Sequence, residues 1–289
     1  MNILITGCNG FIGRNIISRL VNCYNFWGIC KDEAYKPLGV NVIYRDINDT
    51  SWLKKIKDPI DVILHLAQSD FYKEFPLGTL DMVYVNIVST AVLLEWAREN
   101  KVKKFIYTST GNVYGLKADK VCENNSCSPE DMYAVTKLSA ELIVKQYKSF
   151  FDIVILRLFG VYGPDQEKMV IHNIIKKIKN GETIYIAGRK GLVFTPLYVT
   201  DCVDVLKIII EHKLKDVIYN LSGLEIVTLK KIIDIIEQNT AKKAIIEFTN
   251  SEPTFFIADS EKLYNEINFK PRITINEGIV EMLNDETNR

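Results

Sequence analysis

Short apolar runs rich in β-branched residues alternate with amphipathic segments along the first half of the chain. The short runs are apolar at nearly every position, which is typical of strands buried on both faces, and they span 2–6, 26–30, 41–46, 61–67, 103–110 and 152–163. The segments with helical spacing lie at 11–22, 86–101 and 129–149. This alternation predicts an α/β fold with a doubly wound parallel sheet that helices cover on both faces.

The pattern becomes less regular after Gly163 and Pro164. Further helices are predicted at 169–182 and 229–239, a strand at 183–188, and a strand that enters a helix at 194–212. There is no low-complexity run or linker. We therefore expect a larger domain of residues 1–160 with a return segment at 197–218, and a smaller C-terminal α/β lobe of residues 161–196 and 219–289.

The composition argues against some classes of partner. Hydrophobic residues make up 47% of the 289 residues, so a large core is available, and 36 basic residues balance 36 acidic ones. This balance gives no electrostatic reason to expect a nucleic acid or an anionic membrane as the partner. No apolar run approaches the roughly 20 residues of a membrane helix, and the opening MNILITG shows no targeting or lipidation signal, which favours a cytoplasmic location.

The cysteines and histidines do not have the spacing of a metal-binding motif. The six cysteines contain no CxxC pair, and the three histidines are scattered at His65, His172 and His212. His65 lies within the apolar run DVILHLA, where a hydrogen-bonded core histidine is more common than a ligand or a base. We expect no bound metal.

A glycine-rich turn joins the first strand to the first helix. Its sequence GCNGFIG places Gly7, Gly10 and Gly13 three residues apart. Glycines at this spacing let the turn tighten and let the backbone approach a pyrophosphate, which the N-terminus of the helix attracts. Between a strand and a helix, the motif predicts a dinucleotide site rather than a turn that only permits close packing. The expected contacts are Gly7, Asn9, Gly10, Phe11, Ile12 and Gly13.

The end of the second strand bears on the form of the dinucleotide. An acidic residue there would accept from the ribose 2′-hydroxyl, whereas a basic residue would pair with a 2′-phosphate. By its length the acidic position falls on Cys30, and Lys31 and Asp32 follow. Lys31 favours NADP(H), while Asp32 leaves NAD(H) possible. Asp46, at the end of the third strand, could contact the adenine amine or cap a loop.

The stretch SPEDMYAVTK at 128–137 combines a helix start with two candidate catalytic side chains. Ser128 could cap the helix, and Pro129 suits its first position. Tyr133 and Lys137 are four residues apart, about one helical turn, so the phenol and the ammonium share a face. Taken alone, they could be an ordinary surface pair.

Together with the glycine turn, this pair makes the chain resemble the extended short-chain dehydrogenase/reductase family, especially its nucleotide-sugar epimerases, dehydratases and 4-keto reductases. LITGCNGFIG is similar to the family's opening, RDIND to its adenine-side turn, ILHLAQ to its fourth strand, YTSTGNVYG to the segment with the catalytic Ser or Thr, and LRLFGVYGP to the strand before the substrate lobe. The resemblance covers almost the whole chain. It implies a Rossmann-like fold whose larger domain binds the dinucleotide, also through Ile47, Leu66, Ala67 and Gln68, and whose smaller lobe binds the substrate.

The family's mechanism implies a role for each catalytic candidate. Thr110 takes the position of the Ser or Thr that hydrogen-bonds the reacting oxygen, Tyr133 moves the proton, and Lys137 holds the nicotinamide ribose. A free tyrosine has a pKa of about 10, so a nearby ammonium and the positive nicotinamide would bring Tyr133 into its working range. Hydride then passes between the cofactor and a sugar carbon.

One departure from the family pattern reduces the number of reactions that the chain could catalyse. Dehydratases follow the catalytic Thr with Asp-Glu, whereas Gly111 and Asn112 follow Thr110 here, which disfavours dehydration. A reductase of a 4-keto sugar and an epimerase with retained NAD remain, and Lys31 and the short chain favour the reductase. A protein that binds the cofactor without catalysis is a further alternative, although such proteins usually lose the Tyr or the Lys.

Two further departures concern the substrate. Gly160 replaces an Asn of the family motif that often touches substrate, and Phe194 takes the position of an Arg that clamps the nucleotide diphosphate. Either a nucleotide sugar is held in an altered pose, with Arg189, Lys190 or Lys168 supplying charge, or the substrate lacks the diphosphate. The expected substrate contacts are Thr110, Tyr133, Phe159, Gly160 and Arg189. The family also implies a homodimer through helices 86–101 and 129–149.

Overall fold

The computed structural model describes residues 1–115, 117, 119–167 and 169–287. The chain forms two compact units. The first unit consists of Met1–Gly115, Ser126–Arg157 and Val205–Tyr219, and the second unit of Leu116–Asn125, Leu158–Asp204 and Asn220–Arg289. Lys168, a candidate cation for the substrate, lies outside the described residues.

A seven-stranded sheet has the strand order β11-β6-β5-β4-β1-β2-β3. Its strands are β1 (Asn2–Thr6), β2 (Asn25–Cys30), β3 (Val40–Tyr44), β4 (Val62–His65), β5 (Lys104–Thr110), β6 (Asp152–Leu158) and β11 (Ile218–Leu221). β1 pairs in parallel with both β2 and β4, so the strand order reverses at β1. The doubly wound parallel sheet is thereby confirmed, and its switch point lies at the carboxyl ends of β1 and β4.

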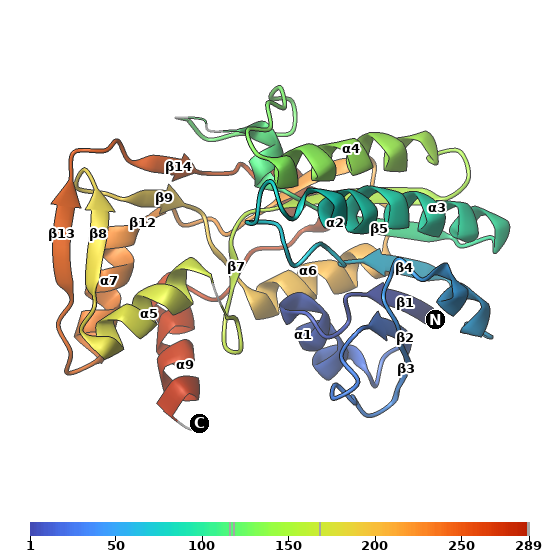
Figure 1. Cartoon of the computed structure of the whole chain (residues 1–289), viewed down its shortest axis with the longest axis horizontal. Helices are drawn as coiled ribbons and strands as arrows, with labels where there is room; N and C mark the ends of the chain where they lie inside the picture. Colours follow the sequence, from blue (N-terminus) through green and yellow to red (C-terminus); the bar gives the residue numbers. More distant parts are fainter. Residues whose placement is uncertain (116, 118, 168, 288–289) are drawn as a thin grey trace. The chain divides into compact units, whose positions relative to one another are not determined.

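Helices cover this sheet on both faces, which explains why its strands are apolar at almost every position. Figure 1 shows α2, α3 and α4 on one side of the sheet and α1 and α6 on the other. The helices are α1 (Phe11–Leu20), η1 (Thr50–Lys55), α2 (Thr79–Val83), the π-helical η2 (Tyr84–Val88), α3 (Ser89–Glu99), η3 (Gly111–Tyr114), α4 (Met132–Gln146) and α6 (Val199–Glu211). Their buried faces meet the strands in a core that includes Ile63, Leu94 and Phe105.

The helix α4 begins later than the sequence predicts. Its N-cap is Asp131, whose carboxylate accepts from the amide of Ala134 at 2.7 Å. The predicted cap at Ser128 is therefore wrong. The amide of Ser128 instead donates to the carbonyl of Val113 at 3.0 Å, which ties this residue to the segment after β5 and leaves the helix to start beyond it.

The run Thr79–Glu99 is longer than the helix expected at 86–101. Its 21 residues are long and apolar enough to cross a membrane by length and composition, so the expectation that no run approaches this length is wrong. Asp81 and Asn86 interrupt the apolar residues, and for this reason no continuous run is visible in the sequence. Core helices pass the same test, and this one buries Val85 and Leu93 in the core of the first unit.

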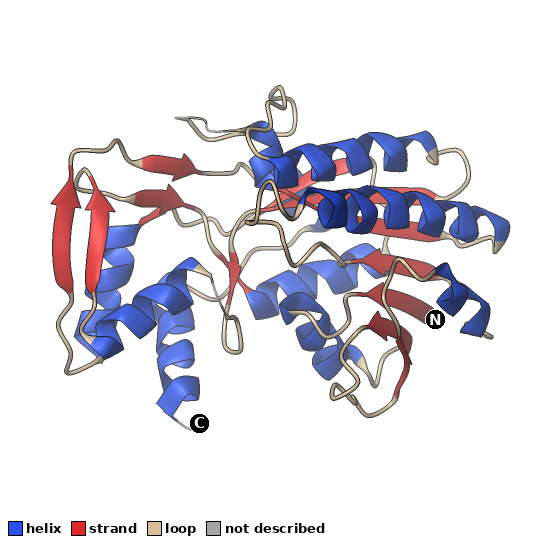
Figure 2. Ribbon diagram, viewed as in Figure 1, coloured by secondary structure: helices blue, strands red, loops and turns tan. Residues whose placement is uncertain are grey.

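The second unit is a mixed α/β structure, whose helices and strands Figure 2 shows in blue and red, and its described residues form three small sheets. Its strands are β7 (Val161–Tyr162), β8 (Thr183–Ala187), β9 (Leu192–Phe194), β10 (Leu197–Tyr198), β12 (Val227–Thr228), β13 (Ile245–Thr249) and β14 (Thr254–Phe256). Its helices are α5 (Val170–Asn180), α7 (Leu229–Asn239), α8 (Glu261–Ile267) and α9 (Ile275–Thr287). The apolar faces of α5 and α7 share a core that includes Ile175, Ile186 and Ile233.

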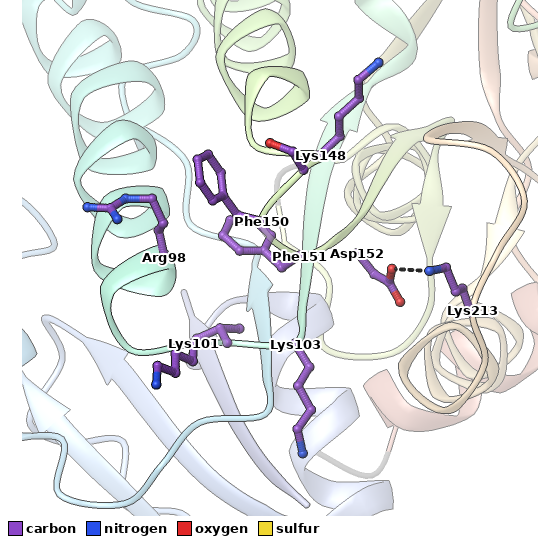
Figure 3. Close-up of a pocket in the computed structure, with 10 residues that line it drawn as sticks. Arg98, Lys101, Lys103, Lys148, Phe150, Phe151, Asp152 and Lys213 are labelled. Carbon is purple, nitrogen blue, oxygen red and sulfur yellow. Dashed lines mark ion pairs between the residues drawn. The ribbon is translucent and has the colours of Figure 1, made fainter.

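A hollow of about 570 Å³ lies at the edge of the sheet where β5 and β6 begin. Figure 3 shows the side chains that line it, among them Arg98, Lys101, Lys148 and the ion pair between Asp152 and Lys213. Cations are favoured here because α3 and α4 end at this edge, and the C-termini of helices carry negative partial charge. The residues that line it include none of those predicted to contact cofactor or substrate.

Candidate active site

The turn between β1 and α1 has the geometry that a pyrophosphate site requires. Gly7 has a φ of +68°, and a Cβ there would lie 3.0 Å from the amide nitrogen of Ala67. A Cβ on Gly13 would lie 2.5 Å from the carbonyl oxygen of Gly7. Gly10 caps α1 without a side-chain hydrogen bond, which leaves the helix N-terminus accessible to an anion. Only glycines permit this close approach, and the turn fits a dinucleotide.

Several predicted cofactor contacts gather at the switch point of the sheet. The amide of Ala67 donates to Oγ1 of Thr6 at 3.1 Å, and the amide of Leu66 donates to the carbonyl of Thr6 at 3.3 Å. The end of β4 is therefore fixed against the glycine turn, where doubly wound sheets bind their ligands. The remaining predicted contacts are Asn9, Phe11 and Ile12 in the turn and the start of α1, and Ile47 after β3.

The side chains beyond β2 and β3 do not favour a 2′-phosphate. Nζ of Lys31 pairs with the carboxylate of Asp46 at 3.0 Å, and this contact raises the pKa of Lys31. Asp46 also accepts from the amide of Asn48 at 2.9 Å, so it has the predicted role of a loop cap. Asp32 accepts from the amide of Ala34 at 2.9 Å. The charge of Lys31 is thus already balanced within the protein.

Thr110, Tyr133 and Lys137 come together in the first unit. Thr110 ends β5, and its Oγ1 accepts from the amide of Asn112 at 3.2 Å. Tyr133 lies at the start of α4, close enough to Thr110 for a hydrogen bond that lowers the pKa of Tyr133. Lys137 follows one turn later, and its buried Nζ lies 4.3 Å from the centre of the Tyr107 ring. The spacing that suggests a shared face therefore does bring the phenol and the ammonium to one region.

Burial favours the neutral forms of Tyr133 and Lys137 and shifts the pKa of each accordingly. It lowers the pKa of Lys137 to about 7, and the carboxylate of Glu141 partly opposes this effect. It raises the pKa of Tyr133 above its ordinary value, while the hydrogen bond with Thr110 lowers it. A lysine whose pKa lies near neutrality is suited to proton transfer.

Two side chains from the segment after β4 contact Tyr133. Its hydroxyl donates to Oε1 of Gln68 at 2.8 Å, and the ring of Tyr72 lies 5.5 Å away, centre to centre. The sequence predicts Gln68 as a cofactor contact, and the structure shows in addition that its side chain accepts from the phenol. Sequence reasoning misses Tyr72, because it lies in an irregular segment that no motif marks.

A buried ion pair supports the middle of α4. Arg157 of β6 donates to the two carboxylate oxygens of Glu141 at 3.0 and 2.7 Å, and Ser109 of β5 donates to Glu141 at 2.5 Å. The sequence analysis does not single out Glu141. Its position four residues after Lys137, on the same face of the helix, is a signal that could have identified it.

His65 is a core residue, as the sequence predicts. Its Nδ1 lies 2.6 Å from Oγ1 of Thr6, and its Nε2 lies 2.9 Å from Oγ1 of Thr90. Burial lowers the pKa of His65 to about 3, so it stays neutral. Among the described residues, no group of three or more His, Cys, Asp or Glu side chains is arranged to hold a metal ion.

Two of the predicted substrate contacts in the second unit, Phe159 and Gly160, lie against aromatic rings. The ring of Phe159 lies 4.6 Å from that of Phe256, centre to centre. A Cβ on Gly160 would lie 3.3 Å from Cδ2 of Phe194, so the two departures from the family pattern are in contact. Arg189 lies instead in the exposed turn between β8 and β9.

Comparison with known proteins relates the chain to enzymes of sugar nucleotides. Residues 3–222 match the model of the NAD dependent epimerase/dehydratase family. The uncharacterized UDP-glucose epimerase YtcB of Bacillus subtilis is 31% identical over 308 residues, with 96% of each chain covered. The human dTDP-D-glucose 4,6-dehydratase is 30% identical over 306 residues, which cover 96% of this chain and 87% of the human protein.

The fold also matches solved structures over the whole chain. The UDP-glucuronic acid 4-epimerase of Bacillus cereus, solved with UDP-glucuronic acid and NAD, has a TM-score of 0.89 and is 30% identical, with 100% of each chain covered. A tyrosine-to-phenylalanine mutant of a UDP-glucuronic acid 4-epimerase from the same organism, solved with a fluorinated analogue and NAD, has a TM-score of 0.90 and is 29% identical, with 100% of this chain and 99% of that chain covered. These matches confirm the Rossmann-like fold.

Proposed function

Because the chain belongs to the NAD-dependent epimerase/dehydratase family, we propose that it is a nucleotide-sugar 4-epimerase that retains NAD. The solved relatives at 29% and 30% identity are 4-epimerases in complex with NAD. The sequence analysis favours a reductase with NADP(H) and keeps the epimerase as the alternative. The comparisons do not support a preference for NADP(H), and the ion pair between Lys31 and Asp46 removes the main argument for it.

The segment after Thr110 favours epimerisation over dehydration. Gly111 and Asn112 begin the short helix η3, and the amide of Asn112 donates to Thr110. Loss of water from a sugar needs an additional acid and base. Neither Gly111 nor Asn112 can supply one, which argues against the activity named for the human relative.

The observation that best supports catalysis is the arrangement of Thr110, Tyr133 and Lys137. When bound, NAD supplies a hydride acceptor and donor. Tyr133 takes the proton of the sugar hydroxyl and later returns it, while Thr110 hydrogen-bonds the reacting oxygen. Protonated Lys137 stabilises the phenolate, and its pKa of about 7 keeps this form populated near neutrality.

The substrate is proposed to be a UDP sugar, because the epimerases among the relatives above act on or bind UDP sugars by name. Phe159 and Gly160 remain candidate contacts for it. With Phe194 packed against Gly160, a cation for the diphosphate has to come from elsewhere, and Arg189 and Lys190 are the described candidates.

A homodimer is part of this proposal. The helical run Thr79–Glu99 exposes Leu80, Tyr84 and Val88 at intervals of four residues, and α4 exposes Val135 and Leu142. Residues four apart line one face of a helix. Such an apolar ridge is typical of an interface between subunits.

The first test is to denature the purified protein and to assay the supernatant for NAD and NADP. The proposal predicts bound NAD that exchanges slowly. The protein is then incubated with UDP-glucose and with UDP-glucuronic acid, and the C4 epimers are separated by chromatography. Tyr133→Phe is the matched control and should lower turnover by about 100-fold or more.

Two other outcomes would replace the proposal. A stripped protein that binds NADPH better than NADH and consumes it with a 4-keto sugar would be a reductase. A protein that retains NAD but turns over neither UDP sugar nor any related nucleotide sugar would be a cofactor-binding protein without catalysis.

A further inference from the structure

The side chain of Gln68 is hydrogen-bonded to the oxygen of Tyr133. The phenol donates to Oε1 of Gln68 at 2.8 Å, although the two residues are 65 positions apart in the chain. We propose that Gln68 is a positioning residue that holds the Tyr133 oxygen in place in both of its protonation states. This inference rests on the proposed function in one respect, because it takes Tyr133 as the group that gives and receives the proton.

A closed path of hydrogen bonds sets the distance between Gln68 and Tyr133. The amide of Ser69, next to Gln68, donates to Oδ1 of Asn86 at 3.0 Å. Nδ2 of Asn86 donates to Oγ1 of Thr136 at 2.9 Å, and Thr136 donates to the carbonyl of Tyr133 at 2.8 Å. Ser69, Asn86 and Thr136 are buried. The backbone of Gln68 is therefore anchored to the backbone of the residue that its side chain contacts.

The chemistry of a primary amide explains why glutamine suits this position. Its oxygen accepts hydrogen bonds and its nitrogen donates them. The phenol of Tyr133 needs an acceptor, whereas the phenolate needs a donor. A half rotation of the terminal amide of Gln68 presents either its oxygen as an acceptor or its nitrogen as a donor, without any change of charge. A carboxylate would serve only the phenol, and an ammonium would serve only the phenolate.

The reaction of an epimerase requires this exchange between acceptor and donor. In each turnover the same oxygen of Tyr133 takes a proton and returns it, so both protonation states have to occupy one position. A partner that bonded only one state would move or destabilise the other. Gln68 can follow the proton in both directions.

The other groups around Tyr133 do not replace Gln68. Those near it are Thr110 and Tyr107 on β5, Tyr72 in the segment after β4, and Asp131 at the N-cap of α4; Lys137 lies one helical turn after Tyr133. Asp131 is engaged as the cap of α4, and Thr110, whose hydrogen bond lowers the pKa of Tyr133, already accepts from the amide of Asn112. Burial raises the pKa of Tyr133 and the hydrogen bond with Thr110 lowers it, so its titration responds to hydrogen bonds at its oxygen.

The test compares Gln68→Glu, which can only accept near neutrality, with Gln68→Met, which can neither accept nor donate strongly. The exposed Gln238 on α7 provides the matched control Gln238→Glu. The ionisation of Tyr133 is followed in the NAD-loaded protein by ultraviolet difference absorbance, with the Tyr133→Phe protein subtracted. Initial rates with a UDP sugar are measured over the same pH range.

Gln68→Glu should raise the midpoint of the Tyr133 titration by about one pH unit or more, because the carboxylate disfavours the phenolate. Its kcat should fall about tenfold near neutrality and recover at higher pH. Gln68→Met should lower kcat about tenfold at all pH values, with KM within about twofold of the parent. Gln238→Glu should change neither the titration nor the rates.

An unchanged titration in Gln68→Glu would overturn the inference. So would a loss of retained NAD in Gln68→Met with kcat preserved at saturating NAD, because Gln68 would then be a cofactor contact, as the sequence suggests. The titration needs no substrate. A parent protein without turnover therefore counts against the proposed function alone, while the titration still decides the role of Gln68.

Discussion

Nζ of Lys137 lies 4.3 Å from the centre of the Tyr107 ring, and both side chains are buried in the first unit. The face of an aromatic ring attracts a cation, but it does not replace water. Burial accordingly lowers the pKa of Lys137 to about 7. Lys137, which should assist catalysis, is thus buried where its charged form is unfavourable. This burial should affect how the free energy of unfolding depends on pH.

Lys137→Met should stabilise the protein below about pH 10.5, most strongly at about pH 7 and below, and should lower turnover by about 100-fold or more. Unfolding restores the ordinary pKa near 10.5, whereas the folded value is about 7, so between these values the unfolded chain binds a proton that the folded protein lacks. The stability of the parent therefore decreases as the pH falls through this window and levels off below about pH 7. The variant should not show this slope.

The measurement is thermal unfolding between about pH 7 and pH 9.5, with the NAD content of the two proteins matched. At pH 8 the variant should have the higher Tm, by about 2 °C or more. A variant that is less stable than the parent throughout this range would show that burial of Lys137 is not costly.

Asp46→Asn should weaken discrimination against NADP(H). The substitution keeps an oxygen that can cap the loop, but it removes the charge that pairs with Lys31 at 3.0 Å. Lys31 could then pair with a 2′-phosphate, and the affinity for NADPH relative to NADH should rise about threefold to tenfold. Titration of the stripped protein with each dinucleotide measures this ratio. Asp49→Asn, which removes the exposed partner of Arg45, is the control and should leave the ratio unchanged.

The sequence could predict the contacts that are local and could not predict those that join distant segments. Tyr133 and Lys137 share one helix, so their spacing in the sequence is enough to predict that they lie on one face. The role of Lys31 depends on its ion pair with Asp46, which follows the neighbouring strand β3. The hydrogen bond between Gln68 and Tyr133 joins residues 65 positions apart. No local spacing contains either contact.

The same reason explains the error at the start of α4. Ser128 and Pro129 have the local chemistry of a helix start. The backbone of Ser128 is bonded to Val113, and Asp131 becomes the cap instead. The parallel strands were easier to predict, because burial on both faces makes each strand apolar whatever its neighbours are.

Glu141→Gln should destabilise the protein by about 3–5 kcal/mol, because it leaves the guanidinium of Arg157 buried without a countercharge. The double variant Glu141→Leu with Arg157→Met should cost less than the sum of its single changes, since it removes both charges. Chemical denaturation of the parent, Glu141→Gln, Glu141→Leu, Arg157→Met and the double variant measures these differences. Asp234→Asn, which breaks the exposed pair with Lys230 on α7, is the control and should cost less than about 1 kcal/mol.

Gly160→Ala should be more destabilising than Gly181→Ala, although both glycines have a φ of +68°. The strain of a side chain at this φ is common to the two positions, at about 1 kcal/mol. A Cβ on Gly181 meets nothing within 4 Å, whereas a Cβ on Gly160 would lie 3.3 Å from the ring of Phe194. The difference between the two variants therefore isolates the contact with Phe194.

We expect Gly160→Ala to cost about 1 kcal/mol more than Gly181→Ala in urea denaturation, since the Phe194 ring has to move in a packed core. In the background of Phe194→Leu, whose side chain is smaller, this excess should disappear. An excess that persists there would assign the effect to the backbone of Gly160. If it disappears, Gly160 and Phe194 form one packing unit, and restoring the family's Asn at residue 160 would also require a smaller residue at 194.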